Sequence, residues 1–254
     1  MQQVRAKKYL GQHFLNNEEI AEKITDSLKE TSHVLEIGPG MGVLTKYLIE
    51  KCMDLKLVEI DKESVEYLTK KYKLSTENLI CGDFLKLPLG TLFENQPYSL
   101  IGNFPYNISN LILFKVFENK NSISEVVGMF QEEVAQRVCA SAGNKTYGIL
   151  SVLLKVFYDI EYLFSVDRQF FNPPPKVQSA VIRLKRNNVE DLGVSEADFV
   201  RVVKTAFNQR RKMLRQSLKP LQKNLDKVNV NYLTLRAEQL KKEDFITITK
   251  QIYL

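Results

Sequence analysis

The sequence predicts an α/β fold, in which a doubly wound, parallel sheet with helices on both faces is followed by a small all-helical C-terminal domain. Three observations support this prediction. Short apolar runs alternate with stretches of helical spacing through residues 1–186, glycines and polar residues gather directly after these runs, and residues 187–254 carry mainly helical spacing. The chain has 254 residues, of which 44% are apolar. That is enough material for one α/β domain and a small second module.

The apolar runs predict the strands in chain order. We expect strands at residues 34–37, 55–60, 78–81, 98–102, 126–130, 158–166 and 180–184. Helical spacing covers residues 43–52, 62–72, 109–119 and 132–141, and a further apolar helix follows the loop at 143–145. Strands that alternate with helices over this length indicate a parallel sheet. Ligands of such sheets bind at the carboxyl ends of the strands, which is where the unusual residues of this chain cluster.

The C-terminal domain is predicted to begin after Arg186. A linker-like stretch follows, and Ser195 is placed to cap the first of two helices expected at 197–207 and 208–221. Residues 1–175 carry 19 Lys and Arg against 22 Asp and Glu, a balance of −3, whereas residues 176–254 carry 17 against 8, a balance of +9. This asymmetry indicates that one part does chemistry while the other holds a polyanion. The alternative is a basic surface that only aids solubility.

Several function classes are disfavoured by composition. Cys52, Cys81 and Cys139 lie far apart and form no CxxC pair, so we expect free thiols in a reducing cytoplasm and neither a zinc site nor a disulfide framework. With only His13 and His33, most histidine-based hydrolytic and metal chemistries lack their residues. No apolar run is long enough for a membrane span, and the basic N-terminal stretch lacks the features of a secretory signal.

A glycine turn follows the first predicted strand. Its sequence, Gly38-Pro39-Gly40-Met41-Gly42, has the spacing GxGxG, and Val43 stands where a dinucleotide fingerprint needs glycine. Glycines let the backbone turn sharply and approach a ligand closely, whereas a proline between them removes an amide that could bind phosphate. The turn therefore favours a cofactor without a phosphate group.

Two acidic residues end the next two strands. Glu59 comes about twenty residues after the glycine turn, where an acid is placed to accept hydrogen bonds from both ribose hydroxyls of a nucleoside. Asp83 ends the third strand and can accept a hydrogen bond from an adenine amino group. The alternative for both is an exposed loop acid or a helix cap, but their register with the glycine turn favours a nucleoside cofactor.

The most specific motif is Asn103-Phe104-Pro105-Tyr106, directly after the fourth strand. It resembles the pattern [N/D]-x-P-[Y/F] of enzymes that methylate amino groups conjugated to a ring. The lone pair of such a nitrogen is delocalised, so the nitrogen is a poor nucleophile. The Asn103 side-chain oxygen and the Phe104 carbonyl can accept the two N–H bonds and direct the lone pair towards a methyl donor without a titrating base. Pro105 stiffens the turn, and Tyr106 offers a face on which an extruded base can stack.

Two later segments suggest contacts with a nucleic acid. Phe171 precedes three prolines at 173–175 and is predicted to cover the other face of the base; an aromatic packed beneath the proline loop is the alternative. The segment 208–219 concentrates charge on a predicted helix, which we expect to neutralise phosphates rather than only face solvent. Its candidate RNA-binding residues are Arg210, Arg211, Lys212 and Arg215.

Together these residues resemble the ribosomal RNA adenine dimethyltransferase family, specifically its small-subunit dimethyltransferase A branch. The matching motifs run along nearly the whole chain: GQHFLNN at 11–17, EIGPGMG at 36–42, VEID at 58–61, GDFL at 82–85, NFPYNIS at 103–109, FNPPPKVQSAV at 171–181, NQRRKMLRQSL at 208–218 and RAEQL at 236–240. Many members have Asn where His13 stands and Leu where Phe104 stands.

The resemblance implies a Rossmann-like, S-adenosylmethionine-dependent methyltransferase domain over residues 1–186 and a basic helical domain for RNA and small-subunit binding over 187–254. The cofactor contacts it implies map onto His13, Leu15, Gly38, Gly40, Glu59, Asp83 and Asn103. It further implies dimethylation of the N6 amino groups of two adjacent adenosines in the 3′-terminal hairpin loop of 16S rRNA. The expected substrate is a partly assembled small ribosomal subunit, and the expected enzyme is a cytoplasmic monomer that acts in ribosome biogenesis without a metal.

Three alternatives stay open at this point. The macrolide-resistance branch, which methylates large-subunit rRNA, would share the cofactor pocket and the motif at 103–106, but the basic segment 208–218 and the RAEQL stretch favour the small-subunit branch. A DNA adenine methyltransferase commonly has a second proline in its motif and lacks such a basic helical tail. A small-subunit assembly factor that has lost catalysis is disfavoured by the intact Glu59, Asp83, Asn103 and Tyr106.

Overall fold

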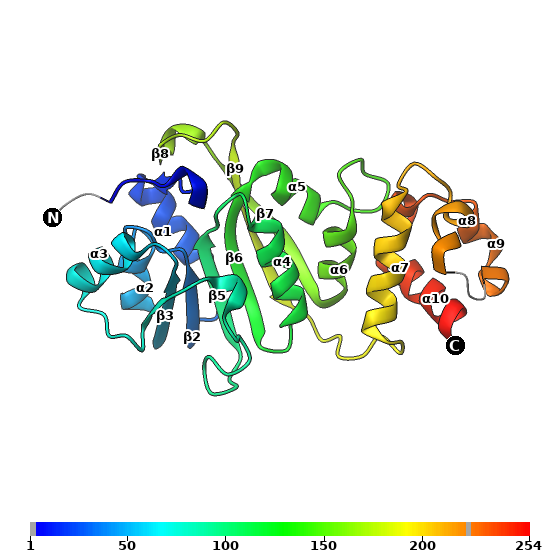
Figure 1. Ribbon diagram of the computed structural model, residues 1–254, viewed down its shortest axis with the longest axis horizontal. Coiled ribbons are helices and arrows are strands. Elements are labelled where there is room, and N and C mark those ends of the chain that lie inside the picture. Colours follow the sequence, from blue (N-terminus) through cyan, green and yellow to red (C-terminus); the bar gives the residue numbers. More distant parts are fainter. Residues whose placement is uncertain (1–3, 222–224) are drawn as a thin grey trace. The chain divides into compact units, whose positions relative to one another are not determined.

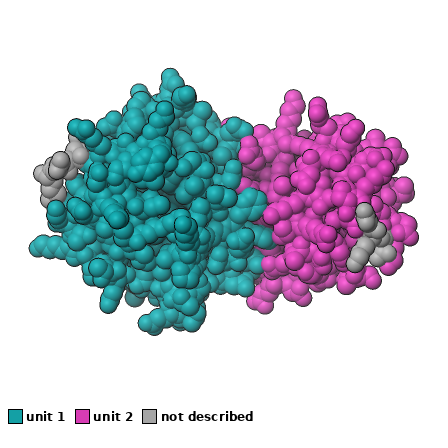
Figure 2. Space-filling model, in the orientation of Figure 1, with its two compact units in different colours: residues 1–135, 160–186 teal, residues 136–159, 187–254 magenta. Residues whose placement is uncertain are grey.

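The computed structural model describes residues 4–221 and 225–254. Its contacts divide into two compact units, shown in Figure 2: the first runs up to Ala135 and includes Ile160–Arg186, and the second comprises Gln136–Asp159 and Asn187–Leu254. The chain therefore passes into the second unit, returns to the first and leaves it again after Arg186, the residue that ends the predicted first domain. Residues 136–159, which the sequence prediction places in that domain, group with the C-terminal unit because the helix they contain packs against two helices there.

The first unit is built on a seven-stranded sheet with the strand order β4-β3-β2-β5-β6-β9-β7 (Figure 1). The strands are β2 His33–Ile37, β3 Asp54–Glu59, β4 Leu79–Cys81, β5 Tyr98–Asn103, β6 Ile123–Gln131, β7 Tyr158–Val166 and β9 Ser179–Arg186. All seven predicted strands are present, and β2 to β6 pair in parallel. The sheet is mixed, however, because β9 pairs antiparallel with β6. Only η3 and β8 lie between β7 and β9, so this connection contains no α-helix of the kind that joins parallel neighbours.

Helices lie on both faces of this sheet, as predicted. They are α1 Glu18–Asp26, α2 Thr45–Lys51, α3 Lys62–Tyr72, α4 Ser109–Glu118 and α5 Glu132–Cys139, with short 3₁₀ helices η1 Lys8–Leu10, η2 Phe84–Lys86 and η3 Arg168–Phe170. Local sequence starts two of the helices: the Asn17 side chain accepts a hydrogen bond from Ile20 N, and Asp61 accepts one from Glu63 N. Such caps satisfy amides that the first helical turn leaves free.

A second, two-stranded sheet was not expected from the sequence. β1 Phe14–Leu15 pairs antiparallel with β8 Phe171–Asn172. Leu15 and Phe171 face each other in this pair, and both side chains lie in the hydrophobic core with α1 and the sheet. This pairing fixes the N-terminal segment beside the carboxyl ends of the parallel strands, where the candidate site lies.

The second unit is helical within the residues described. It contains α6 Ile149–Phe157, α7 Glu196–Asn208, α8 Leu214–Ser217, α9 Val230–Leu233 and α10 Lys242–Tyr253, with 3₁₀ helices η4 Lys219–Leu221, η5 Leu225–Lys227 and η6 Ala237–Gln239. Ser195 caps α7 as predicted, by accepting a hydrogen bond from Asp198 N. No helix in residues 4–221 or 225–254 is both long and apolar enough to cross a membrane.

The prediction of one continuous helix over 208–221 is wrong. α7 ends at Asn208, Gln209 leaves helical geometry, and Lys212 N donates to Gln209 O at 2.8 Å to close a turn. The chain then bonds across to another segment, where Leu214 N donates to Leu235 O at 2.8 Å, before α8 begins. The turn allows Leu214 to be fully buried while the basic residues before it stay at the surface, so burial of one leucine overrides helix propensity here.

Candidate active site

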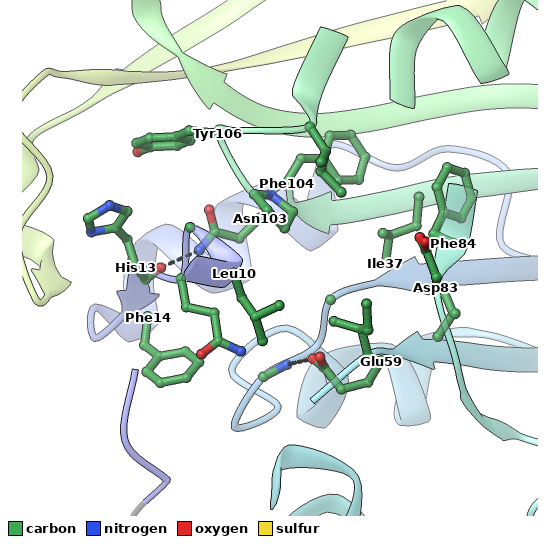
Figure 3. Close-up of a pocket in the computed structure, with 18 of the residues that line it drawn as sticks. Leu10, His13, Phe14, Ile37, Glu59, Asp83, Phe84, Asn103, Phe104 and Tyr106 are labelled. Atoms are coloured by element: carbon green, nitrogen blue, oxygen red, sulfur yellow. Dashed lines mark hydrogen bonds between the residues drawn. The ribbon is translucent and has the colours of Figure 1, made fainter. Parts of the chain in front are cut away.

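A pocket lies at the carboxyl ends of β2, β3, β4 and β5 (Figure 3). Residues after each of these strands contribute to the lining, and the N-terminal residues 10–14 form another wall. The expected ligand position at the carboxyl edge of the sheet is therefore matched by a real cavity.

The glycine turn brings backbone to the floor of this pocket. Gly38 and Gly40 have φ values of +64° and +57°, in the left-handed region that favours glycine. A Cβ atom on Gly40 would come within 2.8 Å of Phe14 Cε1, so the Phe14 ring packs directly on the turn. One side of the turn faces the pocket and is open to a ligand, and the Phe14 ring covers the other side.

Glu59 is the buried acid of the pocket. Its side chain is only 3% exposed, its Oε2 accepts a hydrogen bond from Gly40 N at 3.0 Å, and its Oε1 accepts one from Asp61 N at 2.8 Å. Desolvation by burial raises the pKa of Glu59, and the two amide hydrogen bonds oppose that rise. Each oxygen keeps a further lone pair, so the carboxyl group can accept hydrogen bonds from two neighbouring hydroxyl groups.

Asp83 stands on the adjoining wall. Its Oδ1 accepts a hydrogen bond from Leu85 N at 2.9 Å and thereby caps η2. Lys115 of α4 braces the same loop, because its Nζ donates to Leu85 O at 2.8 Å and to Leu87 O at 2.7 Å. Desolvation lowers the pKa of Lys115, although the nearby Asp83 charge opposes this. The sequence motifs missed Lys115, since a lysine on an amphipathic helix carries no signal of its own.

The Asn103 amide is oriented by the N-terminal segment. Its Nδ2 donates to His13 O at 2.8 Å, shown as a dashed line in Figure 3. Because this bond occupies an amide hydrogen, Oδ1 is left to accept from a ligand. Carboxamide oxygens are strong acceptors that do not titrate, so this one keeps its role across the physiological pH range.

Phe104 anchors the same loop through its side chain. The ring is 1% exposed, packs edge-on against Phe130 with centroids 5.0 Å apart, and fills space over Gly102 and Gly128. A Cβ at Gly128 would lie 2.4 Å from the ring. Among the described residues, no donor reaches the Phe104 carbonyl, whereas the Pro105 carbonyl accepts from Ile108 N at 3.2 Å. The backbone oxygen expected to act on a substrate is therefore free.

Tyr106 presents an aromatic ring at the mouth of the pocket. Its hydroxyl shares a 2.5 Å hydrogen bond with Ser179 Oγ, and burial raises its pKa. The His13 ring stacks on it with centroids 5.3 Å apart and an interplanar angle of 28°. The Nδ1 atom of His13 lies 2.8 Å from Pro173 O and, since a carbonyl only accepts, is the donor.

The structure brings most predicted site residues to one cavity. The pocket is lined by His13, Gly38, Gly40, Glu59, Asp83, Asn103, Phe104, Pro105 and Tyr106. Leu15 and Phe171 are not among them: they are 4% and 2% exposed and pack in the core. A phenyl ring held in the core is not available to stack on a base. The sequence alone does not show whether the Phe171 ring lies in the core or over the pocket.

The basic residues at 210–215 in the second unit differ in their contacts. Arg210 is engaged: its Nε donates to Glu238 Oε2 at 3.0 Å, and its guanidinium also reaches Asn144 O at 3.4 Å. Arg211, Lys212 and Arg215 are exposed. Arg210 thus ties the turn to two other segments, while the other three carry charge available to solvent or a polyanion.

Comparisons with known proteins agree along the whole chain. The family model described as ribosomal RNA adenine dimethylase matches residues 3–253. Proteins named ribosomal RNA small subunit methyltransferase A are similar to it: those of Flavobacterium johnsoniae and Cytophaga hutchinsonii are each 52% identical, cover 99% of this chain, and are themselves covered over 97% and 99% of their lengths.

Solved structures show the same likeness. A dimethyladenosine transferase from Plasmodium falciparum matches with a TM-score of 0.78 and 27% identity, over 93% of this chain and 96% of that one. The 23S rRNA methyltransferase ErmE shares the fold, with a TM-score of 0.70 and 23% identity over 95% of this chain and 100% of its own. The family model and the relatives both extend over the two units and include every residue of the pocket. The chain belongs to the ribosomal RNA adenine dimethylase family.

Proposed function

We propose that this protein transfers methyl groups from S-adenosylmethionine to the N6 atoms of two adjacent adenosines in the 3′-terminal hairpin loop of 16S rRNA. The observation that carries the proposal is the Asn103 amide, which His13 O orients at the carboxyl edge of the sheet in the same cavity as Glu59. The names of its relatives, which specify the small ribosomal subunit, support the choice of substrate.

The pocket fits S-adenosylmethionine. Glu59 can hold both ribose hydroxyls, Asp83 can accept from the adenine amino group, and the open backbone at Gly38 and Gly40 suits the amino-acid end. Apolar side chains of Ile60 and Phe84 line the nucleoside side. When bound, the cofactor supplies an electrophilic methyl group on a sulfonium.

The chain's own residues act on the incoming amino group. Asn103 Oδ1 and the Phe104 carbonyl accept the two N6–H bonds, which draws the nitrogen out of conjugation and makes its lone pair available. Tyr106 stacks on the extruded base and holds it at the mouth of the pocket. The nitrogen gives up one hydrogen, as a proton to water, for each methyl group it gains, so no buried base is needed.

The second unit is proposed to hold the rRNA. Arg211, Lys212 and Arg215 are exposed and free to neutralise phosphates, whereas Arg210 fixes the turn that presents them. We take the substrate to be the partly assembled small subunit in the cytoplasm, and the acting enzyme to be a monomer.

The proposal is tested with labelled S-adenosylmethionine and two substrates: small subunits that lack the modification, and free large-subunit rRNA. Nucleoside analysis should show N6,N6-dimethyladenosine in the small-subunit rRNA alone. Label in the large-subunit RNA would instead favour the macrolide-resistance branch. No transfer to either substrate, with cofactor still bound in a calorimeter, would make the chain a non-catalytic assembly factor.

A further inference from the structure

We propose that the imidazole ring of His13 is the second aromatic wall of the slot that receives the target adenine, opposite Tyr106. This inference rests on the proposed function and adds to it a residue that touches the base itself. It gives the side chain of His13 a role distinct from that of its backbone, whose carbonyl orients Asn103.

The stack between the two rings carries the inference. Both residues line the pocket, and their ring centroids are 5.3 Å apart with planes inclined by 28° (Figure 3). A flat base with van der Waals contacts on both sides needs about 7 Å between the walls. The rings therefore need to part by about 2 Å to admit a base, and until then each covers the face of the other.

The two walls are held differently. Tyr106 is fixed by its hydrogen bond to Ser179 and by burial. The His13 ring is held by one exposed hydrogen bond, from Nδ1 to Pro173 O at 2.8 Å. A rotation of the His13 side chain breaks that single bond and leaves the His13 carbonyl on Asn103 undisturbed. The structure thus assigns the movement to His13 and the fixed platform to Tyr106.

No other described aromatic ring occupies this position. Phe171, the partner expected from the sequence, is 2% exposed and packs in the hydrophobic core. Phe14, the other ring of the N-terminal wall, lies on Gly40 on the side of the glycine turn. His13 alone stacks on Tyr106 in residues 4–221 and 225–254, and it does so beside the amide that is to receive the adenine amino group.

The test uses two substitutions and a matched control. His13→Ala removes the ring, His13→Phe keeps a flat ring without the hydrogen bond, and His33→Ala provides the control. His33 is the only other histidine and also contacts an aromatic ring, that of Phe93 at 5.4 Å, but it lies at the amino end of β2. Three quantities are measured: the Kd for S-adenosylmethionine, kcat and KM on small subunits that lack the modification, and fluorescence of 2-aminopurine placed at the target position in reconstituted subunits.

For His13→Ala we expect kcat/KM to fall about tenfold or more, and by more than any accompanying rise in the cofactor Kd explains. The quenching of 2-aminopurine by stacking should weaken with this variant, because only the Tyr106 face remains, and should be restored by His13→Phe, while His33→Ala behaves as wild type. Two results overturn the inference: His13→Ala indistinguishable from His33→Ala, or a rise in cofactor Kd that accounts for the whole loss of turnover. A wild-type protein with no transfer to small subunits would instead contradict the proposed function.

Discussion

Asn103 combines two hydrogen-bonding roles in one amide group. The donor half is held by His13 O, so the acceptor half is presented in a fixed direction before any substrate arrives. Preorganised dipoles of this kind lower a barrier because they need not reorient during the reaction. The rigidity extends to the next residue, whose buried ring keeps the loop in place.

Asn103→Ala should therefore lower the rate of methyl transfer by roughly two to three orders of magnitude. Cofactor binding should change little, because the amide acts on the incoming base. Single-turnover transfer to small subunits, with the cofactor Kd measured in parallel, checks this. Turnover near that of wild type would remove Asn103 from its assigned role.

Glu36 is buried beside the pocket and gives a second residue-scale prediction. Burial raises its pKa from 4.5 to about 8, while a 2.6 Å hydrogen bond from Thr45 Oγ1 opposes the rise and the charge of Glu59 adds to it. The folded state thus keeps a proton that the unfolded chain loses above about pH 4.5. The unfolding free energy should then fall as pH rises between these two pKa values, by roughly 1 kcal/mol per pH unit.

The Glu36→Gln variant has no carboxyl group at this position, so its unfolding free energy lacks this pH-dependent contribution. Its stability relative to wild type should increase as pH is raised from about 5.5 to about 8.5. Urea unfolding of both proteins at several pH values measures the difference. Parallel stability profiles for the two proteins would show that Glu36 does not carry a raised pKa.

At the scale of elements, α4 supports the proposed cofactor pocket from outside. Lys115 donates to two carbonyls of the loop that carries Asp83, so a change on the helix should be felt in the cavity. Lys115→Met should raise the Kd for S-adenosylmethionine about threefold to tenfold and also lower the melting temperature.

Lys155 of α6 offers a matched control, because its Nζ likewise donates to two carbonyls, Cys139 O at 2.8 Å and Ala140 O at 2.7 Å. Lys155→Met should destabilise the protein to a similar extent without a change in cofactor Kd. Equal effects of both variants on the cofactor would reduce the role of Lys115 to general stability.

How far the sequence predicted these elements depended on the range of the interactions. Strands β2 to β5 and the caps of α3 and α7 follow from local patterns, and so do the positions of Glu59, Asp83 and Asn103 at strand ends. The pairing of β1 with β8 joins two-residue strands from opposite ends of the first unit, so no local pattern indicates it. The turn at 209–212 precedes Leu214, which is buried and hydrogen-bonds to the distant Leu235. The burial of Phe171 and the ring stack of His13 likewise depend on tertiary packing.

At the scale of the whole molecule, charge is separated from chemistry along the chain. Residues 1–175 carry 19 basic and 22 acidic side chains, and residues 176–254 carry 17 and 8. We therefore expect electrostatic attraction to rRNA to be concentrated in the part of the chain without the pocket. Added salt should therefore weaken rRNA binding more than it slows the methyl-transfer step.

Neutralising Arg211, Lys212 and Arg215 together should weaken binding to small subunits and reduce the slope of log K against log salt by about one for each lost phosphate contact. Exchanging each for the other basic residue (Arg211→Lys, Lys212→Arg, Arg215→Lys) retains the charge and should retain the slope. Filter binding at several salt concentrations measures it. An unchanged slope in the neutralised variant would mean that the turn only faces solvent.

The discontinuous second unit also bears on how the protein is made. α6 buries an apolar surface that includes Leu150, Leu153 and Phe157, and it packs against α7 and α10. During synthesis α6 emerges long before α10, which begins only at Lys242. Until then the nascent chain exposes an apolar helix of the kind that chaperones recognise and that favours aggregation. A polypeptide that ends at Arg186 would contain α6 without α7 and α10. We therefore expect such a product, released by ribosomes that stall late in translation, to be prone to degradation.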